Sequence, residues 1–368
     1  MFLRPGTLMT VPFDTARAVI RGEAVFAMGD VMQSGMRAQQ GALNTAAGMF
    51  AVSRAGTLAV IRGTLTGSGE NALIWAARDG RAFPADPATG THTGTRNHAR
   101  ISPDQSRAIV AVYRPMRLEL WLADWKRDAW TLCGDCRTGI DVATWSPDGV
   151  RVLLGQNERL VAHALDGSAP DEVLATERGR ALVPGPWLAD GRIVYQSSPD
   201  LNLTNYEIKL LEHGGGTGRV LVPLGVGKAP EVSPDGRWLA YDSVQTGARE
   251  VIVQAFPGPG SRTQVSAGGG PDPASSADGG TLYYLRPAEP GGSAVVAVDI
   301  AASSVFTVGK PHELFRRPDS QTCGTTRCYD ISADGQRFLF RDFAAKPRGS
   351  ATRMDLVLNW TTTLSNAR

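Results

Sequence analysis

The chain has 368 residues, of which 42% are hydrophobic and 20% are charged, so it holds enough apolar material for a large packed core. Its 38 basic and 36 acidic residues nearly balance without forming a basic block, which argues against binding to nucleic acid or to an anionic membrane surface. No run reaches the roughly 18 apolar residues of a membrane helix, and Pro5, Gly6 and Pro12 interrupt the opening segment, so we expect neither membrane insertion nor a signal peptide.

The first expected elements are two strands near the amino terminus, at residues 6–13 and 24–30. We interpret them as outer strands of a sheet, because no inner strand precedes them. The matching inner strands are expected near the carboxyl terminus, at 329–332, 336–340 and 354–360. A sheet that takes strands from both termini pairs edges that would otherwise be exposed, which favours a ring closed in this way.

A short motif recurs between these ends. It consists of Ser, then Pro or Ala, then Asp-Gly, with an apolar residue before it and a β-type run after it. Clear copies begin at Ser146, Ser233, Ser276 and Ser332, and degenerate copies begin at Ser53, Ser102 and Leu188. Successive copies lie 49, 44, 42, 45, 43 and 56 residues apart. A period of about 40 to 50 residues with β-type segments is typical of four-stranded propeller blades.

The motif has the chemistry of a turn. Pro presets φ near the value of the second turn position, Asp hydrogen-bonds backbone two residues further on, and Gly tolerates positive φ. We therefore interpret each copy as the turn between the innermost and second strands of a blade. Its Asp residues are expected to form turns rather than to act as catalytic carboxylates.

The motif copies delimit a series of sheets, and no helical periodicity appears between them. The sequence predicts one all-β domain over residues 1–368, a β-propeller of seven four-stranded blades closed by strands from both termini, with six or eight blades as alternatives. The expected blades are 1–31 shared with 328–361, 49–86, 98–135, 142–176, 184–224, 229–267 and 273–317.

Two segments carry a family resemblance. Residues 229–241 read APEVSPDGRWLAY and residues 249–260 read REVIVQAFPGPG. Together with GTLMTVPFD at 6–14 and LVLNW at 356–360, they resemble the TolB-like, WD-type propeller that follows the transmembrane segment of many bacterial serine/threonine protein kinases. The resemblance covers nearly the whole chain, and it is specific for the fold rather than for an activity.

The resemblance implies a ligand- or protein-binding ring, often placed outside the cytoplasmic membrane. The kinase motifs themselves are absent from the sequence. Two interpretations stay open: a stand-alone relative of these propellers, or a piece of a larger kinase-fused protein.

Four cysteines form two close pairs, Cys133 with Cys136 and Cys323 with Cys328. Three states are open: two local disulfides, free thiols, or one zinc ion shared by all four. We favour the disulfides, because the pairs precede inner strands of well-separated blades and would face each other across the channel. Local disulfides fit an oxidising compartment, which favours an extracytoplasmic (periplasmic) location over the cytoplasm.

Histidine and nucleophile patterns give no sign of catalysis. His92 and His98 share a polar loop before an inner strand, where they either contact a ligand or are solvated, and we favour the second reading. No Gly-x-Ser-x-Gly elbow occurs, and residues 225–229 lack the residues of a phosphate loop. We expect no catalytic residues, no metal and no cofactor.

The channel offers the strongest binding candidates. Two positions before their motif copies, the inner strands carry the charged residues Arg100, Glu231 and Asp330, which either bind a ligand or are solvated by channel water. Variable loops lead into these strands, and loops on a rigid scaffold usually carry function. The sequence favours a non-enzymatic module that binds a protein, peptide or small ligand at this loop-rich face. The alternative is a hydrolase or lyase with its site at the channel mouth.

Overall fold

The computed structural model describes the chain except for residues 5–6, 32–48, 54, 64–70, 88–94, 115–116, 135, 137–138, 200–202, 204, 259, 290–291, 303–305, 319–325, 343–350 and 361–368. Every element in the described part is a β-strand. No helix found there has the length and apolar character needed to span a membrane. The chain divides into unit 1 (residues 1–38, 42–70 and 346–368) and unit 2 (39–41 and 71–345).

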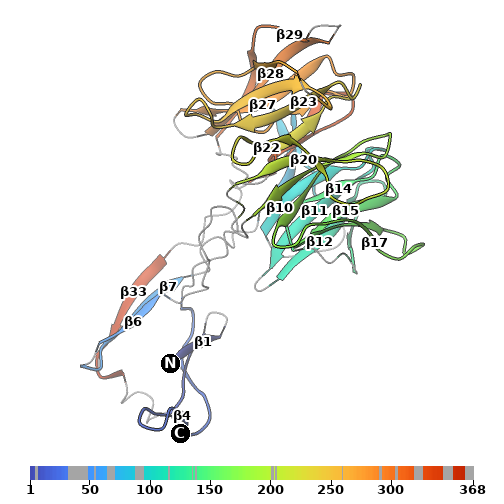
Figure 1. Cartoon of the computed structure of the whole chain (residues 1–368). Helices are drawn as coiled ribbons and strands as arrows, with labels where there is room; N and C mark the ends of the chain where they lie inside the picture. Colours follow the sequence, from blue (N-terminus) through green and yellow to red (C-terminus); the bar gives the residue numbers. More distant parts are fainter. Residues whose placement is uncertain are drawn as a thin grey trace. The chain divides into compact units, whose positions relative to one another are not determined.

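Five sheets of unit 2 are built from consecutive antiparallel strands (Figure 1). In each, an inner strand leads through the motif turn to a second strand whose central residues are buried. Their strands are β10 (Thr95–Ile101), β11 (Arg107–Arg114), β12 (Arg117–Asp124) and β13 (Ala129–Leu132); β14 (Ala143–Trp145), β15 (Arg151–Gln156), β16 (Arg159–Ala164) and β17 (Glu172–Thr176); β18 (Ala181–Trp187), β19 (Ile193–Ser198), β20 (Glu207–Leu211) and β21 (Arg219–Val222); β22 (Gly227–Val232), β23 (Trp238–Ser243), β24 (Glu250–Ala255) and β25 (Arg262–Gln264); and β26 (Ala274–Ser275), β27 (Thr281–Ala288), β28 (Gly292–Ala302), β29 (Phe306–Val308) and β30 (His312–Arg317).

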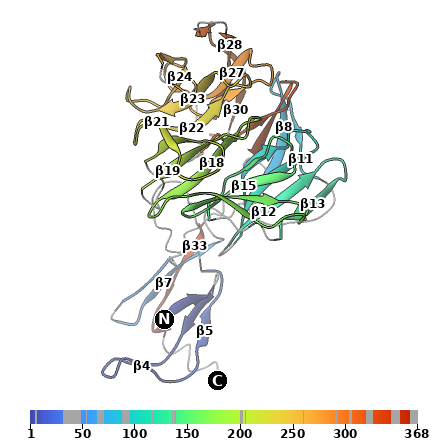
Figure 2. The ribbon, with the colours of Figure 1, turned by 45° about the vertical axis from the view of Figure 1, so that its right-hand side comes forward.

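The sixth sheet of unit 2 joins two distant parts of the sequence. Its inner strands are β31 (Asp330–Ile331) and β32 (Arg337–Asp342), and its outer strands are β8 (Ala72–Ala77) and β9 (Ala82–Pro84). Leu339 pairs with Trp75 in antiparallel register. In Figure 2 the blue β8 lies beside a red C-terminal strand, as this pairing requires.

This pairing corrects two expected strand groupings. Residues 328–342 pair with β8 and not with strands before residue 31, and residues 49–86 do not form one sheet. The physical reason is burial. Leu73 to Ala76 are buried without interruption, as befits a strand covered on both faces, whereas β7 (Leu58–Gly63) alternates buried and half-buried residues.

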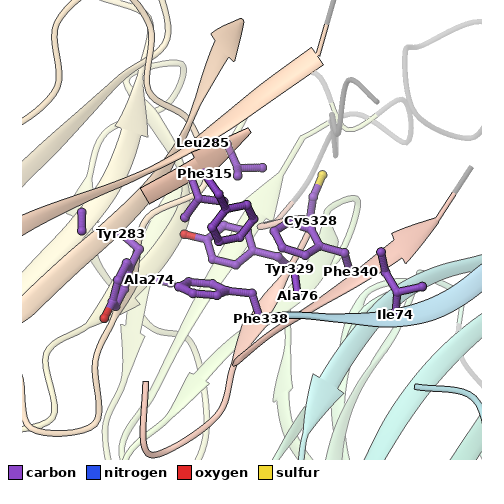
Figure 3. Close-up of a cluster of buried hydrophobic side chains, with 12 residues drawn as sticks. Ile74, Ala76, Ala274, Tyr283, Leu285, Phe315, Cys328, Tyr329, Phe338 and Phe340 are labelled. Atoms are coloured by element: carbon purple, nitrogen blue, oxygen red, sulfur yellow. The ribbon is translucent and has the colours of Figure 1, made fainter. Parts of the chain in front are cut away.

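The core of unit 2 consists of buried clusters between neighbouring sheets. The cluster in Figure 3 packs Phe338, Phe340 and Tyr329 of the sixth sheet against Phe315 and Tyr283 of the β26–β30 sheet. The rings of Phe315 and Phe338 meet edge to face with centroids 5.4 Å apart. On the other face of the sixth sheet a second cluster contacts the β10–β13 sheet.

Further clusters join each consecutive pair of sheets from β10 to β30. Each of the six sheets therefore packs against two others, which is the arrangement of blades in a β-propeller.

The motif copies form the turns that the sequence predicts. Ser102 shows the pattern: its Oγ donates to Asp104 Oδ1 at 2.6 Å and accepts from Arg107 N–H at 3.0 Å. In the copy that begins at Ser146, Gly149 has a φ of +70°, a backbone conformation that glycine adopts without strain. The residue after such a turn also ties sheets together, since the Arg107 guanidinium lies 5.2 Å from the ring of Trp145 in the next sheet.

The described residues of unit 1 form two three-stranded sheets and one hairpin. The sheets are β1 (Phe2–Arg4), β2 (Thr7–Thr10) and β5 (Val25–Met28), and β33 (Ala351–Val357), β7 and β6 (Phe50–Val52); the hairpin is β3 (Phe13–Asp14) with β4 (Val19–Ile20). Leu8, Val31, Leu58 and Val60 form its small core. The number of blades in the whole chain stays a prediction.

Candidate functional site

The inner strands of unit 2 line a cavity of about 210 Å³. It brings together the three charged residues that the sequence places in the channel, Arg100, Glu231 and Asp330. Thr144 and Pro186, which stand at the same offset from their own motif copies, also line it. All of these residues stand two positions before the turn of their own inner strand. Because side chains alternate between the two sides of a strand, this shared offset turns each of them to the same side. Whether these residues bind a ligand stays a prediction.

Arg327 occupies the centre of the charged group, and the sequence reasoning missed it. Its Nη1 donates to Glu231 Oε2, and its Nη2 donates to Asp330 Oδ1 at 2.7 Å. Glu231 comes from β22 and Asp330 from β31, so one guanidinium joins the inner strands of two sheets. Its Nε–H is buried and has no hydrogen-bond partner within the described residues. One donor of Arg327 is therefore left without a partner in the described part of the chain.

Arg100 fastens the segment that carries Arg327. The Nη2 of Arg100 donates to Thr326 Oγ1 at 2.9 Å and to the Arg327 carbonyl at 3.0 Å, while Nη1 donates to the Ala99 carbonyl at 2.8 Å. Asp330 Oδ2 accepts from the Ile101 N–H at 2.8 Å. The segment from Thr326 to Asp330 is therefore bonded to β10 at two points, and this fixes the position of Arg327.

Burial shifts the pKa values of the charged groups in the cavity. Desolvation raises the pKa of Glu231, against the opposing effect of Arg327. Desolvation, with the charge of Arg327, lowers the pKa of Arg100 to about 10. Desolvation also lowers the pKa of Arg327, but the carboxylates of Glu231 and Asp330 outweigh it, so this pKa lies above its usual value. The site thus holds two cations beside two acidic groups in a largely desolvated setting.

His98 lies behind this group and not at the cavity surface. Its side chain is 1% exposed; Nδ1 shares a hydrogen bond with Thr326 Oγ1 at 3.1 Å, and Nε2 lies 3.6 Å from Asp141 Oδ2. Desolvation lowers the pKa of His98 to about 4 although Asp141 opposes it, so the ring is neutral at physiological pH. Its contact with the cavity lining runs through Thr326. His92 lies outside the described residues.

A second buried group of charges adjoins the same segment. Arg249 Nη2 donates to Asp242 Oδ2 and lies 3.4 Å from Asp272 Oδ1. Asp272 Oδ2 accepts from the Cys328 N–H at 3.2 Å, and the Tyr329 hydroxyl donates to the Asp272 carbonyl at 3.1 Å. Desolvation and the neighbouring Asp242 raise the pKa of Asp272. These contacts hold the segment from its other side.

The residues that line the cavity can recognise a ligand by hydrogen bonds and charge. Its described lining includes Arg, Glu, Asp and Thr but no Ser, Cys, Lys or His. A nucleophile next to a neutral base, the usual arrangement for covalent catalysis, is therefore not found among the lining residues described.

Neither Cys133 nor Cys136 lines the cavity. Cys133 and Cys136 form a disulfide in the loop after β13. Cys328 is also disulfide-bonded, and Cys323 lies outside the described residues.

Comparisons with known proteins give the fold and not a family. No protein-family model and no curated protein matches the sequence. Among solved structures, a protein assigned as TolB from Agrobacterium tumefaciens is similar over 77% of this chain and 99% of its own, with 16% identity and a TM-score of 0.57. TolB from Acinetobacter baumannii is similar over 80% of this chain and 68% of its own, with 14% identity and a TM-score of 0.49. A gluconolactonase from Xanthomonas campestris is similar over 68% and 86%, with 14% identity and a TM-score of 0.46. The chain is a β-propeller whose fold is similar to that of TolB.

Proposed function

We propose that this β-propeller is a non-enzymatic recognition module whose binding centre is the channel cavity around Arg327. The observation that carries this proposal is the pre-formed charged group: Arg327 joins Glu231 and Asp330, and Arg100 holds its segment in place. Pre-organised charged side chains reduce the cost of ordering a site when a ligand binds.

The cavity suits a ligand with at least one hydrogen-bond acceptor. The buried Nε–H of Arg327 has no partner among the described residues, so a carbonyl or carboxylate that reaches it would satisfy a donor that is otherwise left without one. About 210 Å³ admits a side chain or a small metabolite rather than a folded domain. We propose a peptide segment or small ligand that inserts one polar group, with any larger partner resting on the surrounding loops.

In biological terms, the function that fits best is that of a sensor or interaction domain in a receptor-type kinase system on the extracytoplasmic side of the membrane. The support for this finer assignment is the sequence resemblance at 229–241 and 249–260 and the disulfide between Cys133 and Cys136.

A pair of tryptophan substitutions tests the binding centre. Thr144→Trp fills the cavity, because Thr144 lines it, whereas Val150→Trp places the same side chain at an exposed position of a motif turn. We expect compounds from a panel of short peptides and small carboxylates to raise the melting temperature of the wild type and of Val150→Trp but not of Thr144→Trp. Equal shifts in all three proteins would place binding outside the cavity.

An enzyme is the second candidate, and one observation favours it. Desolvation raises the pKa of Glu231, and a carboxyl group with a raised pKa beside a cavity is typical of a general acid. Turnover of a lactone or uronate substrate that disappears in Glu231→Gln but persists in the exposed control Glu172→Gln would support this alternative over simple binding.

A further inference from the structure

The disulfide loop after β13 lies against a histidine of the next sheet. Cys133 follows β13, the outermost strand of its sheet, and His163 belongs to β16, the third strand of the neighbouring sheet. The ligand atoms of Cys133, Cys136 and His163 all lie within 4.8 Å of one another. Within the described part of the chain, this is the one group of three such residues.

His163 is oriented by a carboxylate. Its Nδ1 lies 2.7 Å from Asp171 Oδ1, and its side chain is 14% exposed. A carboxylate that holds one nitrogen of an imidazole fixes the ring and leaves the other nitrogen for a metal, an arrangement usual around histidine ligands of zinc. Nε2 is therefore the nitrogen that would coordinate.

The surroundings suit thiolate chemistry with a soft divalent ion. Cys136 is 7% exposed and packs in the cluster that joins the two sheets. Two thiolates and one neutral imidazole cancel the charge of a divalent cation, so the loaded site would place no net charge in this partly buried position. Tetrahedral zinc separates its ligand atoms by roughly 3.7 Å, so the two sulfurs must move apart once the disulfide is broken, while their distances to the imidazole, within 4.8 Å, already lie near the required range.

We propose that Cys133, Cys136 and His163 form a redox-gated zinc site, in which the disulfide and the bound metal are alternative states. A thiol or phosphine reductant supplies two electrons and breaks the S–S bond, which gives two thiols with protons from solvent. Zn²⁺ then displaces both thiol protons and binds two thiolates and His163, with water in the fourth position.

The two states connect the sheets differently. The disulfide closes a loop within one sheet, whereas the metal would join that loop to β16 of the next. Zinc should therefore stabilise this junction only after reduction. The inference is independent of the channel cavity and of its proposed function.

Metal binding to the whole chain tests this site. The protein is reduced with a phosphine under anaerobic conditions, loaded with Zn²⁺ or Co²⁺, and desalted. We expect about one equivalent of zinc in the reduced chain and none in the oxidised chain, with the thiolate-to-metal charge-transfer and tetrahedral ligand-field bands of Co²⁺. His163→Ala should abolish tight binding, Asp171→Asn should weaken it about 10- to 100-fold, and His213→Ala, at a site outside this group, should leave it unchanged.

Several results would overturn the proposal. One is that the reduced chain binds no metal. Another is that His163→Ala binds metal as tightly as the wild type, because the ion would then lie elsewhere. Circular dichroism covers the case in which reduction unfolds the chain. If reduction unfolds the chain, zinc must restore the fold of the wild type but not that of His163→Ala. If zinc does not restore the wild-type fold, the proposed site is equally refuted.

Discussion

Replacing Arg327 by methionine would test how far the charged group stabilises unit 2. The substitution keeps an unbranched side chain but removes the partner of both Glu231 and Asp330. Breaking a buried ion pair by removing one partner costs about 3 to 5 kcal/mol, because the other charge is left desolvated. The three side chains are 10% to 19% exposed, so we take the lower end, about 3 kcal/mol. For a unit of this size, that loss lowers the melting temperature by roughly 5 °C.

The loss should depend on pH. Burial already raises the pKa of Glu231 above its ordinary 4.5, and Arg327 is the main group that opposes this effect. Without Arg327 the folded-state pKa rises further, and the folded protein holds a proton that the unfolded chain releases. The stability of the variant therefore falls as the pH rises above about 4.5 towards that higher pKa, and its deficit relative to the wild type is smallest in acid.

Thermal and urea unfolding at pH 5 and pH 7.5, followed by circular dichroism, measure both effects. The double variant Arg327→Met with Glu231→Gln should recover part of the loss at pH 7.5, since it removes the unpaired charge. A cost below about 1 kcal/mol for Arg327→Met, or strict additivity of the two substitutions, would refute the reasoning.

Three further outcomes are expected. The neutral, buried His98 has a pKa of about 4 in the folded protein against an ordinary 6.5, so the wild type should lose stability as the pH falls from 6.5 towards 4. The urea midpoint of His98→Gln should not fall in this way. An equal dependence on pH in both proteins would contradict the neutral state of His98. Ser146→Ala removes the hydroxyl that accepts from Arg151 N–H at 2.9 Å in its motif turn, and should cost about 1 to 2 kcal/mol in urea unfolding, whereas the exposed Ser168→Ala serves as a control near zero. Gly155→Ala should lower the melting temperature clearly, because the new Cβ would lie 2.5 Å from the Leu182 carbonyl oxygen of the next inner strand, while Gly167→Ala, which meets no neighbour, should cost only the strain of its positive φ.

The propeller and part of its channel could be predicted because both follow from local chemistry. Each motif copy fixes a turn, and the turn fixes which residue of the inner strand faces the channel. This is why Arg100, Glu231 and Asp330, far apart in the sequence, line one cavity.

Arg327 could not be found in this way. It precedes its inner strand in a loop, where no periodicity applies, and its partners Glu231 and Asp330 are brought to it by the arrangement of whole sheets. The sequence offers only an Arg three residues before the candidate carboxylate Asp330. This pattern is too common to single out Arg327.

The predicted grouping of strands into sheets was wrong at residues 49–86 for a related reason. The degenerate copy at Ser53 does form the expected turn, with Thr57 N–H donating to Ser53 Oγ at 3.0 Å. The strand after it, β7, nevertheless pairs with β33 and not with β8. Turn residues determine local hairpins, but the choice of partner between two apolar strands depends on burial across the whole ring, which the local pattern does not contain.

The sixth sheet also sets the order in which the protein can be completed during synthesis. β8 emerges from the ribosome early, yet its partner β32 is made some 260 residues later, since Trp75 pairs with Leu339. At about 5 to 20 residues per second, the apolar residues of β8 wait more than roughly ten seconds before Phe338 and Phe340 are made, whereas those of β27 wait only a few seconds. During that interval the first and last sheets of unit 2 expose apolar faces that β32 later covers. The nascent chain would need protection by chaperones at this stage. β31 and β32, the last strands of unit 2 to be translated, complete the packing of the sixth sheet against both of its neighbours.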